Sequence, residues 1–130
     1  QSTPYAGDAY FREWPQTLDT LAEFNAEKMV PGRGPALKSA EEVRKGLAGT
    51  RAFLTDLYSS VLNGVADGKD LKTIYRETYD FMKPRYADWV IFDHCMPFDV
   101  ARAYDEATGY DDPQIWTAER DIEMWKRLEG

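Results

Sequence analysis

The stretch Met-Val-Pro-Gly-Arg-Gly-Pro at residues 29–35 decides how the rest of this sequence is interpreted. Met29 and Val30 suit the end of a buried strand, because apolar and β-branched side chains are favoured there. The two glycines permit positive φ angles and close backbone approach, and the two prolines fix φ and end regular structure. The pattern predicts a short strand over Lys28 to Pro31 that stops in a tight, stiff loop holding Arg33.

Arg33 is the first candidate for a functional residue. Its guanidinium stays protonated at any working pH, so it cannot act as a general base. It can bind an anion or a substrate carboxylate, or it can form a salt bridge with an acid within the loop. The sequence leaves both interpretations open.

The residues around this loop resemble a known family. Residues 14–21, Trp-Pro-Gln-Thr-Leu-Asp-Thr-Leu, followed by the 29–35 stretch, are similar to the late part of the metallo-β-lactamase-fold hydrolases. In that family a helix with a W-x-x-(S/T)-L-x-x-L pattern leads into a strand ending in V-P-G-H-G-P. The resemblance covers roughly residues 8–37. It implies an αββα sandwich with one or two zinc ions, whose bound water attacks an ester, thioester, lactam or phosphoester bond.

The chain departs from this family at the metal site. The histidine of P-G-H-G-P is usually the last metal ligand of the family, and Arg33 stands at that position here. The H-x-H-x-D-H ligand cluster of the family is absent from the chain. The resemblance therefore implies that zinc and a small-molecule substrate belong to a parent hydrolase. This chain would hold no metal ligand, cofactor or catalytic residue, and would not be catalytic by itself.

We therefore expect a mainly α fold with one short strand. Residues 1–37 would give the last helix, strand and loop of a metallo-β-lactamase-like domain, and residues 38–130 a helical C-terminal region. A single strand cannot satisfy its own backbone, so the αββα sandwich would be completed elsewhere. The partner would be the N-terminal remainder of the same protein or a second copy in a homodimer. A first residue of Gln1 rather than methionine fits a processed chain or a fragment.

Beyond the loop the sequence predicts helices joined by turns. Ser39 and Glu42 have the spacing of a capping box. An apolar stripe with helical period follows as far as Asp67-Gly68, a length of roughly 27 residues or about 40 Å. The next helix, capped by Asp70, should form an antiparallel hairpin with it. Each glycine inside the long helix costs up to about 1 kcal/mol, and we expect close helix packing to compensate. These glycines are Gly46, Gly49 and Gly64.

The boundaries of the helices towards the C-terminus are predicted from prolines and capping residues. Pro84 is expected to limit the second helix of the hairpin, and Pro97 to open or precede the next one. Trp89 to Phe92 is an apolar run in which periodicity does not separate helix from strand, and we favour helix. Thr117 is expected to cap the last helix.

His94, the only histidine, stands between Asp93 and Cys95. Adjacent residues on a helix diverge by about 100°, and a zinc site needs three or four ligands. We expect a buried or half-buried histidine that bonds to Asp93, Asp99 or the backbone. The alternatives are a His94 that contacts an anion or substrate and a nucleophilic Cys95.

Composition excludes several classes of partner. The formal net charge of −7 argues against nucleic acid and against anionic membranes. A hydrophobic content of 43% argues against disorder. A single cysteine permits no intramolecular disulfide. None of this specifies the compartment.

The alternative function is a non-enzymatic helical module for dimerisation or docking. Its support is the long capped helix, the helical hairpin and the excess of tryptophan. For the aromatic residues, core packing is the first interpretation, and a substrate wall or a dimer interface is the second. A self-sufficient helical module does not need a strand before the 29–35 loop, whereas a truncated sandwich does. The presence of the strand would therefore favour the hydrolase hypothesis. Arg102 and Asp105 are expected to form an ordinary pair on a helix surface. The aromatic set is Trp89, Phe92, Phe98, Tyr104, Trp116 and Trp125.

Overall fold

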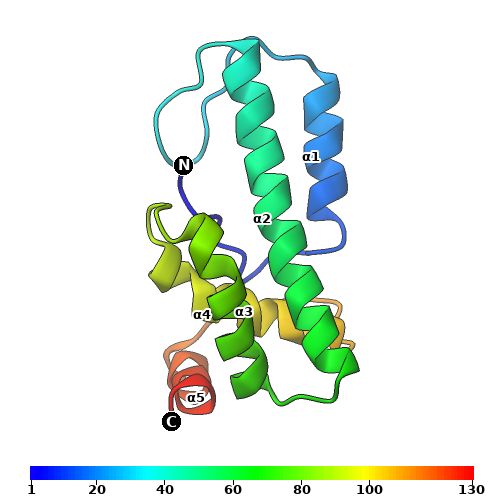
Figure 1. Cartoon of the computed structure of the whole chain (residues 1–130), viewed down its shortest axis with the longest axis vertical. Helices are drawn as coiled ribbons and strands as arrows, with labels where there is room; N and C mark the ends of the chain where they lie inside the picture. The colour runs from blue at the N-terminus through cyan, green and yellow to red at the C-terminus, as the bar shows by residue number, and fades with distance from the viewer.

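The computed structural model describes residues 1–130 and is mainly α-helical, with no β-sheet (Figure 1). This confirms the mainly α prediction. The helices are α1 (Trp14–Glu23), α2 (Ala40–Ala66), α3 (Leu71–Tyr86), α4 (Phe92–Ala107) and α5 (Ala118–Leu128).

Helix α2 is the axis of the molecule (Figure 1). α1 lies beside its first half, α3 runs back along its second half, and α4 crosses behind it. α5 packs against α3 and α4 at the end opposite to the loop between α1 and α2. The predicted antiparallel hairpin of α2 and α3 is thereby confirmed.

The bounds of α2 follow from its caps. The Ser39 side chain accepts a hydrogen bond from the Glu42 backbone N–H (3.2 Å). The Glu42 carboxylate accepts from the Lys38 N–H (2.6 Å) rather than from Ser39, so only half of the predicted capping box forms. At the other end Gly68 has a φ of 72°, which is the left-handed conformation that glycine adopts readily after a helix. The predicted length of α2 is confirmed at 27 residues.

The two prolines do not set helix boundaries as predicted. Pro84 lies inside α3 and Pro97 inside α4, which begins earlier, at Phe92, after a turn. A proline inside a helix costs about 3 kcal/mol. In α4 the side chains of Phe92, Met96 and Val100 on either side of Pro97 are all buried, and their packing outweighs that cost.

The core lies where α2, α3 and α4 meet, and it contains 20 buried hydrophobic residues. Trp89 stacks on Phe53 (5.7 Å between ring centroids) and meets Tyr86 edge-on (4.9 Å). Core packing is thus confirmed for Trp89, whereas Trp125 is 63% exposed.

The strand expected over Lys28 to Pro31 is reduced to one antiparallel bridge between Met29 and Leu37. The two residues exchange both backbone hydrogen bonds (3.0 and 2.8 Å). A strand needs neighbours on a sheet, and nothing else in this chain pairs with the segment.

Gly64 tests the expectation that close packing compensates for the glycines of α2. A Cβ atom at Gly64 would lie 2.6 Å from Cγ1 of the buried Ile74 on α3. We expect Gly64→Ala to destabilise the fold by about 1–3 kcal/mol through overpacking, despite its better helix propensity. Urea unfolding measures this change.

Gly49→Ala is the matched control on the same helix. Its Cβ would meet only the exposed amide end of Gln1, which can move away. We expect Gly49→Ala to be neutral or to stabilise by up to about 1 kcal/mol. Equal effects at both positions would contradict the close α2–α3 packing.

Candidate functional site

The candidate site lies where the loop of residues 31–36, the N-terminal segment and the start of α4 meet. A Cβ atom at Gly34 would lie 3.7 Å from the Ser2 hydroxyl oxygen. Ser2 forms a parallel bridge with Val90, just before α4, and the Thr3 N–H donates to the Val90 carbonyl (3.0 Å). Three segments that are distant in the sequence are therefore adjacent.

Arg33 lies at the exposed tip of this loop. None of the ten ion pairs in the chain includes it, so the salt bridge within the loop is not formed. Its positive charge nevertheless opposes the rise in the pKa of Cys95 on α4 that burial causes. The structure thus places a cation without an ionic partner beside the start of α4.

His94 is exposed, which contradicts the expected buried histidine. Its ring lies 5.5 Å from the Phe98 ring, and it forms no side-chain hydrogen bond with Asp93 or Asp99. Asp93 instead accepts from the Tyr79 hydroxyl (2.7 Å). The sequence could not predict the bond between Tyr79 and Asp93, because the two residues belong to different helices.

Cys95 lies one residue further and is fully buried. Burial raises the pKa of its thiol to about 11, Asp99 raises it as well, and Arg33 lowers it. A nucleophilic cysteine needs an exposed thiol with a lowered pKa. The structure offers neither condition, so the hypothesis of a nucleophilic Cys95 has no support here.

Asp99 is one turn further along α4 and is also fully buried. One carboxylate oxygen accepts the Ala6 N–H (2.6 Å), and the other has no partner. Burial raises the pKa of Asp99 well above its usual range, the Ala6 N–H lowers it, and the charge of Asp8 raises it. Folding therefore favours the neutral carboxyl form of Asp99 more than the unfolded chain does.

Arg102 is fully buried, which contradicts the surface pair expected with Asp105. Its guanidinium donates to the carbonyl oxygens of Ala9 (2.6 Å), Tyr110 (2.9 Å) and Asp111 (2.8 Å). It also lies 3.5 Å from the Glu106 carboxylate. Asp105 pairs with Arg120 of α5 instead (2.8 Å).

Glu106 completes this buried cluster. Its carboxylate accepts from the backbone N–H groups of Phe11 (2.8 Å) and Arg12 (3.1 Å) and from the Arg12 side chain (3.0 Å). The sequence analysis missed the cluster although a signal existed: Cys95, Asp99, Arg102 and Glu106 recur at helical spacing. α4 is buried on several sides, so the side of the helix that carries Cys95, Asp99, Arg102 and Glu106 faces protein rather than water.

A hollow of about 570 Å³ lies beside the N-terminal segment and the start of α1. Its walls carry the Tyr5, Tyr10 and Trp14 rings and the carboxylates of Asp8 and Glu13. Two carboxylates make this hollow electronegative, so it does not suit the anion that Arg33 could bind.

No group of three or more His, Cys, Asp or Glu side chains lies close enough together to hold a metal ion. Arg33, a permanent cation, occupies the position that resembles a metal ligand of the family. The residues of this chain therefore do not fit a zinc ion. No helix is long and apolar enough to cross a membrane. No known protein-family profile matches the chain, and no curated protein sequence does either.

The Arg102 cluster leads to a stability prediction. Arg102→Met removes the cation but leaves three carbonyl groups and Glu106 buried without it, so we expect a loss of about 3–5 kcal/mol of unfolding free energy. Arg51→Met is the control, because Arg51 forms an exposed pair with Asp19 whose loss should cost about 1 kcal/mol or less. Urea unfolding of both variants measures the contrast. A small effect at Arg102 would mean that the guanidinium is not buried.

Asp99 leads to a prediction on pH. Because its pKa is raised by folding, the folded protein binds this proton more tightly than the unfolded chain does. Stability is then lost as the pH rises from about 3.9, the ordinary Asp value, towards the folded pKa. Asp99→Asn carries no such proton, so its stability relative to wild type should increase as the pH rises above about 4. Urea unfolding across this range measures the difference, and a difference independent of pH would refute the assignment.

Proposed function

We propose that this chain is the C-terminal part of a metallo-β-lactamase-like hydrolase and is not catalytic by itself. It would supply a helix, a strand edge, the Arg33 loop and a helical body beside the substrate pocket of the parent. The resemblance over residues 8–37 supports this proposal. So does α1, which occupies Trp14–Glu23, the stretch with the W-x-x-(S/T)-L-x-x-L pattern.

The observation that carries the proposal is an uncovered arm, which we define as residues 14–47. Figure 1 shows α1 and the first half of α2 as a pair of helices standing above the body of the molecule. Only Leu18, Val43 and Leu47 are buried within the arm. By contrast Phe24 is 75% and Val30 84% exposed. Helices that bury so little need a further layer of structure to cover them.

The unpaired backbone groups of the arm indicate which kind of structure could cover it. Met29 directs its N–H and C=O towards Leu37. In antiparallel pairing successive residues face opposite edges, so Lys28 and Val30 direct their backbone groups to the other side. These groups have no backbone hydrogen-bond partner. An apolar segment with a free edge can extend a sheet, as the sandwich of the parent requires.

Arg33 follows directly after this edge. Its guanidinium has no ionic partner in the chain, and planar guanidinium groups bind carboxylates and phosphates in a bidentate manner. We assign Arg33 the role of contacting an anionic group of the substrate, in place of the metal ligand that the family has there. The zinc ligands would come from the rest of the parent.

The alternative function is a non-enzymatic helical module for dimerisation or docking. It is supported by the core of α2, α3 and α4, which is closed within the chain, and by the exposed side of α5, where Ile122 is 55% and Trp125 63% exposed. This alternative gives no role to the free edge at Lys28 and Val30.

The coding sequence upstream of Gln1 tests the proposal directly. We expect an in-frame H-x-H-x-D-H cluster within roughly one domain length. A start codon or a signal peptide next to Gln1 would exclude the hydrolase and leave the helical module.

Val30→Lys tests the role of the arm. Val30 is 84% exposed, so the variant should unfold within about 0.5 kcal/mol of wild type. When the upstream part of the parent is co-expressed as a separate chain, wild type should co-purify with it and Val30→Lys should not. Ile115→Lys is the matched control, since Ile115 is equally exposed (84%) but lies outside the arm. Equal retention of all three proteins would show that the arm is not the contact.

A further inference from the structure

The hollow beside the N-terminal segment has aromatic walls. Tyr5, Tyr10 and Trp14 line it, and its volume of about 570 Å³ lies in the range of small-molecule sites. The Tyr5 ring packs against the Phe98 ring (5.6 Å between centroids). The Tyr10 hydroxyl donates to Asp112 (3.1 Å), and Trp14 packs against the hydrophobic core. Contacts within the chain thus place the three rings before any ligand binds, which lowers the cost of binding.

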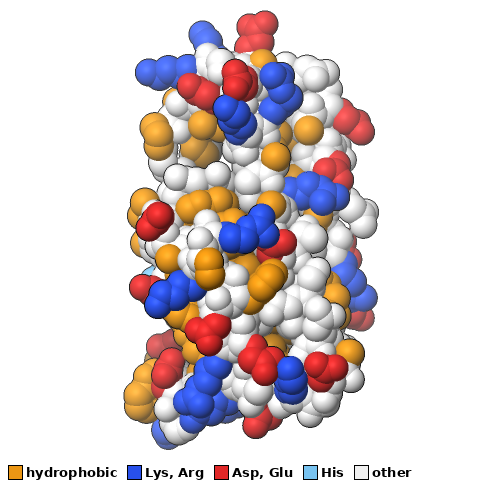
Figure 2. Space-filling model, in the orientation of Figure 1, with side chains coloured by type: hydrophobic (Ala, Val, Ile, Leu, Met, Phe, Trp, Pro, Cys, Tyr) orange, Lys and Arg blue, Asp and Glu red, His pale blue; other side chains and the backbone are white.

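Two carboxylates without an ionic partner lie at the same hollow. Asp8 and Glu13 belong to its lining and to none of the ion pairs of the chain, and the Glu13 side chain does not cap α1. Arg12 lies between them in the sequence, but its side chain pairs with Glu106 and Asp111. On the face shown in Figure 2 acidic and basic side chains are mixed, whereas no basic side chain lines the hollow. Its negative charge is therefore not compensated from within.

One ring of the hollow already binds a cation of the chain. The Arg102 guanidinium lies over the Tyr10 ring, 5.6 Å from its centroid, which is within the range of a cation–π contact. Arg102 is fully buried and occupies one side of this ring. No cation of the chain lies over Tyr5 or Trp14. These two rings remain available to a cation from outside.

We propose that this hollow binds a small molecule with a quaternary ammonium group. Aromatic rings attract such a group through their quadrupoles, and the carboxylates of Asp8 and Glu13 balance its charge. A primary ammonium carries three N–H donors and is strongly hydrated, and aromatic walls satisfy none of these donors. A quaternary ammonium has no N–H donor to leave unsatisfied. The net charge of −7 also favours the approach of a cation.

The proposal does not rest on the hydrolase hypothesis, because no residue of the 31–36 loop lines the hollow. Choline is the probe, and its neutral isostere, in which a carbon atom replaces the nitrogen, is the control ligand. Amide and indole ¹H–¹⁵N spectra of the full chain at constant ionic strength measure binding. We expect choline to shift the Asp8 and Ala9 amides and the Trp14 indole N–H saturably. The neutral isostere should bind about tenfold more weakly or not at all.

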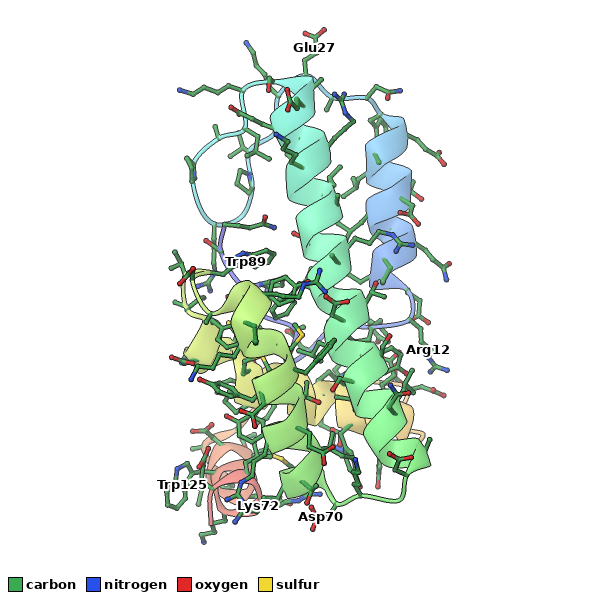
Figure 3. All side chains as sticks on the ribbon, viewed as in Figure 1. Arg12, Glu27, Asp70, Lys72, Trp89 and Trp125 are labelled. Atoms are coloured by element: carbon green, nitrogen blue, oxygen red, sulfur yellow. The ribbon has the colours of Figure 1, made fainter.

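Three variants test the two parts of the site. Trp14→Leu keeps an apolar side chain but removes the ring, and it should weaken choline binding by about tenfold, with circular dichroism to confirm that it remains helical. Glu13→Gln keeps the shape of the wall and removes one charge, and it should weaken binding by about threefold. Glu27→Gln is the matched control, because Glu27 is also exposed but lies at the far end of the arm (Figure 3). It should leave binding unchanged.

Four outcomes would overturn the proposal. They are the absence of a saturable shift, a neutral isostere that binds as tightly as choline, the same shifts with calcium chloride in place of choline, and a Glu13→Gln variant that binds no more weakly than Glu27→Gln.

Discussion

The structure depends above all on the buried guanidinium of Arg102. A cation removed from water is tolerated only when nearly all its donors are bonded and an opposite charge is near. Here three carbonyl groups and Glu106 meet these conditions. Two of the carbonyl groups belong to the turn after α4 and the third, that of Ala9, to the segment before α1. Glu106 in turn binds the backbone of Phe11 and Arg12. The Arg102 side chain thus ties the segment before α1 to the turn after α4, and Glu106 adds two bonds to the same segment.

The rest of the molecule has two regions, one with a closed hydrophobic core and one with exposed apolar side chains. Around α3, α4 and the second half of α2, side chains from three helices meet and the core is closed. Along the first half of α2 the only other helix is α1, and apolar side chains of α1 and of the loop after it stay exposed, among them Leu21, Phe24 and Val30. Because α2 is continuous across both regions, the arm is held in place by the body without having a core of its own.

The sequence predicted the features that depend on local chemistry. Ser39, Asp70 and Thr117 each cap a helix as expected, and Gly68 ends α2. Predictions failed where contacts between residues distant in the sequence determine the structure. Pro84 and Pro97 lie inside helices because packing outweighs their local cost. Arg102 is buried because the chain folds back over α4. Helix periodicity places Arg102 and Glu106 on one side of α4 but does not say whether that side is covered. The candidate site was only half predictable, since Arg33 is evident from its loop but the position of that loop beside Ser2 and Val90 depends on tertiary contacts.

The two uncovered surfaces of this chain differ in the partner they can accept. The edge at Lys28 and Val30 offers backbone donors and acceptors in a row, and only another strand can satisfy those groups together. The exposed side of α5 offers mainly side chains, because the backbone groups in the middle of a helix are bonded within it. A chain that paired with the arm would therefore add a strand, whereas the exposed side of α5 offers only side-chain contacts.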